Sequence, residues 1–313
     1  MNKFTFQVGL FIFMLIPQLC SGLDLSLRPR FNTGVQYFEY SQDVFKFNSG
    51  SISGSGQTSE VNLKDFTPFV SGGLTLFVDR FFIDSSVQFS FDGEDSIHTT
   101  NDFSFPARGT LPESEVNIGG ENNVNFDRLE YSFSLGYAIT DQIVAYAGYK
   151  RARTKIDIPI QNRSTAVVTA NSAPNPGLSG TVTGQLDLDY EYDGAFIGGA
   201  YSQNIEMGFL QGALSANVAI AFMDGEVDVQ FNNLKINNQM GSQNLNIDIL
   251  SGGLKGDTVG ISAGLAWNGI TAINGLTYLV GVNGYHYEFD GIENSPNFSE
   301  TVVRVDFGLS FTF

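Results

Sequence analysis

Within the last thirteen residues, Thr301 to Phe313, two kinds of side chain alternate from Val303 onward. Between the large apolar residues stand small or polar ones, among them Arg304, Asp306 and Gly308. Because successive side chains of a strand point to opposite faces, this segment predicts a strand with one apolar and one wet face. The apolar series is Val303, Val305, Phe307, Leu309, Phe311 and Phe313.

Nine earlier segments alternate in the same way, which predicts ten strands in all. They are residues 27–40, 66–78, 81–92, 126–138, 143–155, 186–201, 209–223, 257–268 and 276–288, and the tenth is 301–313. Their connections are alternately long, rich in Gly, Ser, Asn and Asp, and very short. This asymmetry is typical of an all-β, closed antiparallel transmembrane barrel with long extracellular loops and short periplasmic turns. Twelve strands is the alternative, if residues 44–64 or 224–250 contain an extra hairpin.

Two other architectures are less favoured. After residue 22 no apolar run is long enough for a transmembrane helix, so a chain that spans a membrane must do so as a closed barrel. A secreted β-sandwich also alternates. However, the wet faces here carry Gly, Ala and Ser, which suit the inside of a narrow barrel better than an exposed sheet.

The N-terminus predicts export. A short basic region, Met1 to Lys3, precedes an apolar run from Phe4 to Leu19 and the small residues Ser21 and Gly22. We expect residues 1–22 to be a cleaved signal peptide and residues 23–313 to form the barrel. Cys20, the single cysteine, would leave with the signal, so the mature chain would have no disulfide. A lipoprotein signal at Cys20 is disfavoured because Pro17-Gln-Leu19 lacks the small residues it requires.

With its signal, its alternating strands and its terminal Phe313, the chain resembles the outer-membrane β-barrels of Gram-negative bacteria. That resemblance implies an outer-membrane location, with outer-membrane lipid and lipopolysaccharide as surroundings. It also implies that the barrel-insertion machinery reads the C-terminal strand. The predicted insertion signal is Phe307, Leu309, Phe311 and Phe313.

Charged residues on two neighbouring predicted strands indicate a ladder on the lumen wall. If Tyr146 and Gly148 face lipid, the basic residues that follow them face inward. The same reasoning turns the acidic residues after Leu186 inward. Such a ladder would stiffen the barrel, or would form a charged constriction that sets ion selectivity. The predicted lumen charges are Arg128, Glu130, Arg151, Arg153, Lys155, Asp187, Asp189, Glu191 and Asp193. A second inward set, Arg28, Arg30, Arg304 and Asp306, is expected to join the first strand to the last, with Arg28 or Arg30 paired to Asp306.

Charge and motifs exclude several functions. The chain has 33 acidic and 16 basic residues, which argues against a nucleic-acid partner. Acidic loop segments such as Asp92 to Asp95 and Asp224 to Asp228 leave divalent cations possible there, but the calcium-loop pattern that starts at Asp189 fails at Ala200. We therefore expect no cofactor and no defined metal site.

The predicted function is a narrow or gated, porin-like pore with a charged lumen. The alternative is a surface structural or adhesion barrel that acts through its long acidic loops. A minor alternative is a protease, since ten strands of this length resemble the omptins, which use an Asp pair opposite an Asp–His pair. However, residues 224–256 contain no His, and neither His98 nor His286 has a matching constellation. We therefore do not expect this protein to be an enzyme.

Overall fold

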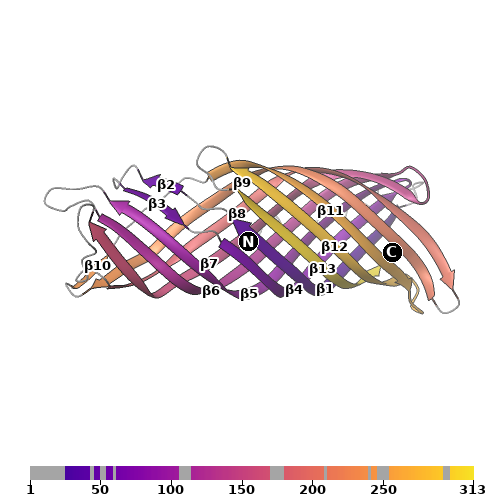
Figure 1. Ribbon diagram of the computed structural model, residues 1–313. Coiled ribbons are helices and arrows are strands. Elements are labelled where there is room, and N and C mark those ends of the chain that lie inside the picture. The colour runs from indigo at the N-terminus through magenta and orange to yellow at the C-terminus, as the bar shows by residue number, and fades with distance from the viewer. Residues whose placement is uncertain are drawn as a thin grey trace, which may run out of the picture.

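The computed structural model describes residues 25–42, 46–49, 54–58, 61–105, 114–169, 180–207, 210–238, 241–244, 254–291 and 297–313. Ten strands form a closed antiparallel barrel, in which β1 pairs with both β4 and β13 (Figure 1). These strands are β1 (Leu25–Gln42), β4 (Val61–Val78), β5 (Phe81–Phe105), β6 (Ser114–Ala138), β7 (Ile143–Thr169), β8 (Gly180–Met207), β9 (Leu210–Asn238), β11 (Leu254–Ile270), β12 (Leu276–Gly291) and β13 (Phe298–Phe311). No helix in these ranges is long and apolar enough to cross a membrane.

Each of the ten predicted strands is present, and each neighbours the next along the wall. The twelve-strand alternative is wrong. The hairpin of β2 (Lys46–Ser49) and β3 (Gly54–Thr58) pairs with β5, and β10 (Gly241–Asn244) pairs with β9. These three short strands lie at the loop end and do not enter the wall (Figure 1).

The strands β5 to β9 are much longer than the sequence predicted, at 25 to 29 residues each. A tilted strand needs only about 9–11 residues to cross the hydrocarbon core. The barrel wall therefore continues well beyond the apolar band on the loop side. We call this part the projecting half.

The alternation inverts where the projecting half begins. On β7, outward side chains change from the half-exposed Tyr149 to the charged Arg151 and Arg153. Inward side chains change in the opposite sense, from Lys150 to the fully buried Ile156. Within the membrane a barrel is apolar outside and polar inside. In water it behaves as an ordinary β-protein, with its apolar side chains inside.

The same inversion marks the neighbouring strands. On β9 the outward series changes at Phe222, which is 58% exposed, to Asp224 and Asp228. On the inward face of the same strand, Met223 and Val227 are buried. The hydrophobic core of the molecule thus lies in the lumen of the projecting half.

Candidate functional site in the barrel lumen

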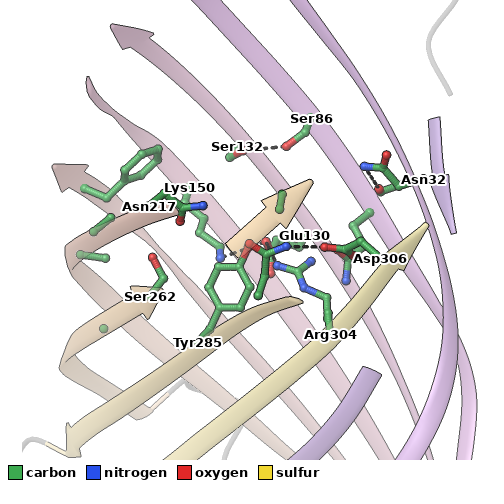
Figure 2. Close-up of a pocket in the computed structure, with 18 of the residues that line it drawn as sticks. Asn32, Ser86, Glu130, Ser132, Lys150, Asn217, Ser262, Tyr285, Arg304 and Asp306 are labelled. Carbon is green, nitrogen blue, oxygen red and sulfur yellow. Dashed lines mark hydrogen bonds and ion pairs between the residues drawn. The ribbon is translucent and has the colours of Figure 1, made fainter. Parts of the chain in front are cut away.

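The lumen within the apolar band is hollow and polar. A cavity of about 410 Å³ is lined by small polar side chains, among them Asn32, Ser132, Asn217 and Ser262, which point into a common space (Figure 2). A second hollow of about 560 Å³ shares part of this lining and extends to Arg80 at the β4–β5 turn. The lumen is therefore accessible from the turn end.

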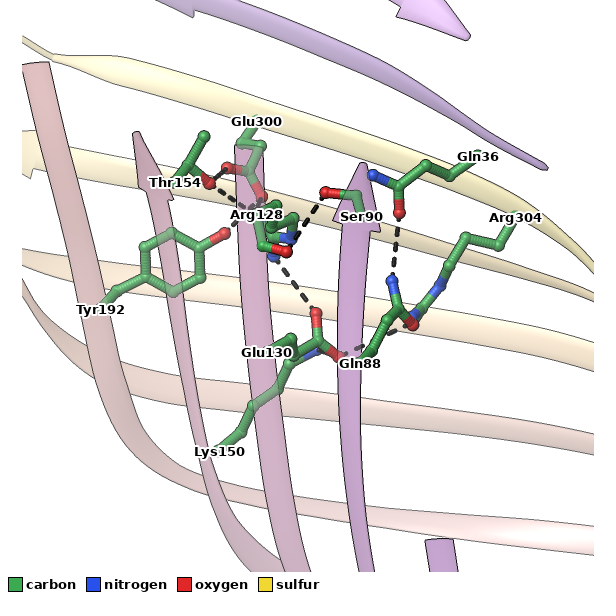
Figure 3. A network of polar contacts seen from close by, with 10 residues as sticks. All are labelled: Gln36, Gln88, Ser90, Arg128, Glu130, Lys150, Thr154, Tyr192, Glu300 and Arg304. Carbon is green, nitrogen blue, oxygen red and sulfur yellow. Dashed lines mark hydrogen bonds and ion pairs between the residues drawn. The ribbon is translucent and has the colours of Figure 1, made fainter. Parts of the chain in front are cut away.

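A buried group of charges, which we call the charged roof, closes the loop-side end of the cavity. Glu130 on β6 lies 2.9 Å from Lys150 on β7, 3.3 Å from Arg128 and 3.7 Å from Arg304 on β13 (Figure 3). All four residues are less than one-tenth exposed. One carboxylate is thus shared by three cations that reach it from three strands.

A second carboxylate completes the group. Glu300 on β13 forms an ion pair with Arg128, although the two residues are 172 positions apart in the chain. It also accepts hydrogen bonds from the hydroxyls of Tyr192 and Thr154. Because a buried charge is costly unless it is paired and hydrogen-bonded, these contacts explain how Arg128 and Glu300 can both be almost completely buried.

Tyr285 on β12 links two of the cations. The Lys150 ammonium lies 3.9 Å from the centre of its ring, and the Arg304 guanidinium carbon 4.2 Å from it. Cation–π contacts of this kind contribute about 0.5–2 kcal/mol each, with the higher values in dry surroundings. These contacts fix Lys150, Glu130 and Arg304 at the loop-side end of the cavity, and Figure 2 shows them gathered around Tyr285.

Aromatic rings fill the lumen beyond the charges. Ring centres lie 4.7 Å apart for Phe38 and Phe126, 4.9 Å apart for Tyr190 and Phe298, and 4.3 Å apart for Phe298 and Phe289. All of these side chains are at most 5% exposed. We call this group, together with Tyr40, the aromatic closure. It obstructs the lumen of the projecting half.

The predicted lumen ladder between β7 and β8 lies on the other face of the wall. The ion pairs themselves exist, since Arg151 contacts Glu191 and Arg153 contacts Asp189. However, their side chains are partly exposed on the outside, while Ala152 and Tyr190 face inward. The inward placement of Arg151, Arg153, Lys155, Asp187, Asp189, Glu191 and Asp193 is therefore wrong.

The error has a physical reason. On β7 the premise that Tyr146 and Gly148 face lipid is wrong, because Tyr146 lines the lumen cavity and Arg151 and Arg153 lie on the opposite face. On β8 the apolar residues Leu186, Leu188, Tyr190 and Tyr192 were expected to face lipid. In the projecting half the solvent outside is water, and the same residues turn inward and are buried. The inward placement of Arg128 and Glu130 is confirmed, because these residues lie on the turn side of the point where the alternation of β6 inverts.

The residues that were expected to join the first strand to the last contact other partners than those predicted. Arg28 donates to the hydroxyl of Thr312 at 3.2 Å, which joins β1 to the C-terminus. Arg30 pairs instead with Asp84 of β5, at 2.6 Å. Asp306 accepts from Asn283 of β12. The pairing of Arg28 or Arg30 with Asp306 is therefore wrong, and Arg304 belongs to the roof of the cavity.

The C-terminal residues face outward as the alternation predicted. Phe307 and Leu309 are each 53% exposed, and the Phe313 ring packs at 4.6 Å against that of Phe311. The backbone amide of Phe313 donates to Leu27 at 3.0 Å. The end of the chain is thus fixed in the wall while its aromatic side chains point toward lipid.

Titratable groups outside the roof form no catalytic constellation in the described ranges. His286 lies on the outer wall, with its Nδ1 at 2.9 Å from the hydroxyl of Thr301. The side chain of His98 lies outside the described residues, as do those of Asp92 to Asp95. Asp224 to Asp228, expected in a loop, belong to strand β9. Among the described residues no group of three or more His, Cys, Asp or Glu could hold a metal ion.

Sequence reasoning missed Lys150, Glu300, Tyr192 and Tyr285. Lys150 is a lone charge beside Gly148 and Ala152 on one face of β7, and that isolation was a usable signal. No local signal relates Glu300 to Arg128, because their contact depends on the curvature that brings β13 opposite β6.

No protein-family model matches the chain, and no curated protein sequence matches it. Among solved structures, it is similar to the outer membrane protease OmpT from Escherichia coli, with a TM-score of 0.55 and 10% identity over 94% of this chain and 99% of that one. The translocator domain of autotransporter NalP from Neisseria meningitidis matches with a TM-score of 0.33 and 10% identity, over 99% and 96% of the two chains. Neisserial surface protein A matches at 0.29 and 6% identity, over 94% and 100%. The chain therefore has the fold of the outer-membrane β-barrels of Gram-negative bacteria.

Proposed function

We propose that this protein is a closed, non-conducting barrel that acts at the cell surface through its projecting half. The observation that carries this proposal is the aromatic closure. Phe38, Tyr190 and Phe298 occupy the lumen beyond the charged roof, and each is at most 5% exposed. Opening a path would require these packed rings to separate, at a cost of about 0.5–1.5 kcal/mol for each aromatic pair beyond the area exposed.

Two further features support action at the surface. Strands β5 to β9 are more than twice as long as a membrane crossing requires. The outer face of their projecting part is charged, as at Arg151, Glu191 and Asp224. A wall of this kind presents fixed polar groups outside the membrane, beneath the long loops.

Single-channel recording tests the closure. In planar bilayers the refolded mature protein is expected to be silent, and the triple variant Phe38→Ala, Tyr190→Ala, Phe298→Ala to show discrete steps. Phe222→Ala, which removes a ring of the same kind from the lipid-facing side, is the matched control and should remain silent. Steps from the unsubstituted protein would contradict the proposal.

Thiol labelling tests the orientation. The mature chain as predicted carries no cysteine, so Glu226→Cys on the outer face of β9 and Asp141→Cys in the β6–β7 turn supply unique sites. On intact cells a membrane-impermeant maleimide should label the first and spare the second. The reverse pattern would place the projecting half in the periplasm and would refute a surface role.

A gated pore is the second candidate, because the hollow lumen reaches from the turn end to Lys150 and Arg304. In that case the charged roof and the aromatic closure together would form the gate. Voltage-dependent steps from the unsubstituted protein in the same recordings would favour this function.

A further inference from the structure

The lumen cavity, the hollow of about 410 Å³ on the turn side of the charged roof, is rich in uncharged hydrogen-bonding groups. Five carboxamide side chains line it, on five different strands: Asn32, Gln88, Asn217, Asn268 and Asn283. A carboxamide both donates and accepts hydrogen bonds, as does a hydroxyl group. The cavity therefore matches a molecule that is itself rich in hydroxyls, and its size is within the range of about 300–1,000 Å³ of small-molecule sites.

Glycines hold several of these carboxamides against the wall. Gly264 on β11 is directly opposite Asn217 on β9 and Asn283 on β12. A Cβ at Gly264 would collide with the side-chain oxygen of Asn283 and the side-chain nitrogen of Asn217, and a Cβ at Gly308 would collide with the side-chain oxygen of Asn32. The carboxamides thus occupy the room that larger side chains at these glycines would take. The middle of the lumen stays open, with polar groups fixed around it.

The same device turns an aromatic face toward the cavity. Tyr146 on β7 reaches across β8, and its hydroxyl donates to the carbonyl oxygen of Val218 on β9 at 3.3 Å. Its ring passes over Gly198 of the intervening strand, where a Cβ would lie 2.6 Å from ring atoms. The ring of Phe196 stands beside it, with ring centres 6.1 Å apart, and both rings line the cavity. Because the Tyr146 ring lies along the wall, one of its faces is turned toward the lumen.

The charges at the cavity balance one another. Three cations and three anions stand there: Arg30, Lys150, Arg304, Asp84, Glu130 and Asp306. Arg30 donates two hydrogen bonds to the carboxylate of Asp84, at 2.6 and 2.7 Å, and Glu130 is shared by Lys150 and Arg304. Burying a charge is costly unless it is paired. A cavity whose own charges sum to zero favours neither an anion nor a cation, so it suits an uncharged polar molecule.

The cavity is reached from the turn end. The second hollow, of about 560 Å³, shares Asn32, Ser132 and Asn217 with it and extends to Arg80 in the β4–β5 turn. On the other side, the charged roof and the aromatic closure stand between the cavity and the loops. In an outer-membrane barrel the short turns face the periplasm. A ligand of the cavity would therefore come from the periplasm.

We propose that the lumen cavity binds a small neutral sugar from the periplasm, with its hydroxyls on Asn32, Asn217 and Asn283 and a face of its ring on Tyr146. A sugar carries hydroxyls around its rim and C–H groups on its ring faces, so it matches the carboxamides and the aromatic face together. An apolar ligand would leave the buried carboxamides without hydrogen-bond partners, which is costly. The site serves the turn end of the barrel, whereas the proposed surface role belongs to the projecting half.

Saturation-transfer NMR tests the site. The mature protein is refolded in lauryldimethylamine oxide, a detergent without a sugar headgroup, and mixed with an excess of glucose, N-acetylglucosamine or maltose. Saturating the protein methyl groups should transfer magnetisation to at least one of these sugars. Asn32→Leu with Asn217→Leu replaces two carboxamides by apolar side chains of similar size and should lower the transfer several-fold. Asn125→Leu is the matched control, because it makes the same change on the exposed outer face of β6, and it should leave the transfer unchanged.

Three results would overturn the proposal. The first is no transfer to any of the three sugars, and the second is equal transfer in the double variant and in Asn125→Leu. The third is stronger transfer to glucuronate or glycine betaine, which carry charges, than to the neutral sugars.

A second variant covers the case in which the double variant lacks the heat-modifiable migration of a folded barrel. Ser262→Phe leaves every carboxamide in place and fills the cavity, because Ser262 points into the same space as Asn217 (Figure 2). It should abolish the transfer to the sugars. Unchanged transfer in Ser262→Phe would refute a site in the lumen.

Discussion

Glu130 and Lys150 face each other across β6 and β7, with the carboxylate oxygen 2.9 Å from the ammonium nitrogen, inside a barrel whose outer wall carries other ion pairs between neighbouring strands. The inner pair is almost completely buried, while Arg151 and Glu191, one residue further along, are partly exposed. Two ion pairs, each between a glutamate and a basic side chain of β7, therefore stand in different dielectric surroundings on the two faces of that strand.

Removing the charge of Glu130 should be far more harmful than removing that of Glu191. Glu130→Gln leaves Lys150, Arg128 and Arg304 without their shared carboxylate, and losing one partner of a buried ion pair costs about 3–5 kcal/mol. Glu191→Gln should cost about 0.2–1 kcal/mol, because its pair with Arg151 is exposed to water. Urea unfolding of the refolded barrel in lipid vesicles, followed by the fluorescence of Trp267, measures both. Similar losses from the two variants would contradict the placement of Glu130.

Removing a charge from the lumen should change the ion selectivity, whereas removing a charge from the outer wall should not. In the opened triple variant described above, Lys150→Met removes a cation from the lumen and should shift selectivity toward cations. Arg151→Ala should leave the reversal potential unchanged, because the guanidinium lies on the outer wall. The measurement is the reversal potential in a salt gradient across a planar bilayer. A shift in the reversal potential caused by Arg151→Ala would indicate that the Arg151 side chain faces the lumen.

A row of aspartates crosses the outer wall above the apolar band. Asp193, Asp224, Asp257 and Asp290 are directly opposite one another on β8, β9, β11 and β12. Like charges in such positions are destabilising, so Asp224→Asn should stabilise the barrel by about 0.2–1 kcal/mol. The gain should shrink as salt is added, because these charges are exposed.

Glu226→Gln is the control for this effect. Glu226 is opposite Lys255 on β11 and opposite Glu191 on β8, whose carboxylate is paired with Arg151. Losing its charge should therefore bring a smaller gain than Asp224→Asn. The chemical denaturation midpoint at low and high salt is the readout for both variants. If Asp224→Asn instead lowered the stability, and a chelator removed this difference between the variant and the unsubstituted protein, the row would hold divalent cations.

The ring of Phe313 should affect assembly of the barrel in cells more than the stability of the folded barrel. Phe313 is 72% exposed and contacts chiefly Phe311, so Phe313→Ala removes little buried surface. We expect slower accumulation of the folded, heat-modifiable form in cells, where the insertion machinery acts, and unchanged refolding in detergent. Pulse-chase labelling measures the rate of folding in cells, and a refolding assay measures the rate in detergent. Equal defects in both would show that Phe313 acts through stability alone.

Much of the architecture could be predicted from local pattern. The alternation from Val303 to Phe313, repeated in nine other segments, determined ten strands, their order and the alternation of long loops with short turns. These features follow from the period of two along a strand, which every residue carries in the sequence itself. The inward positions of Arg128 and Glu130 followed from the same rule.

The tertiary structure decided which face of each strand looks inward in the projecting half. The pattern of β8 from Leu186 to Asp193 is the same whether its apolar face meets lipid or a core, since alternation defines two faces but not their surroundings. What separates the two cases is the height of the residue above the membrane, and that depends on the tilt and length of the whole wall. Glu300 meets Arg128, and the aromatic rings meet in the lumen, only because closure of the barrel brings distant strands to opposite sides of a narrow space.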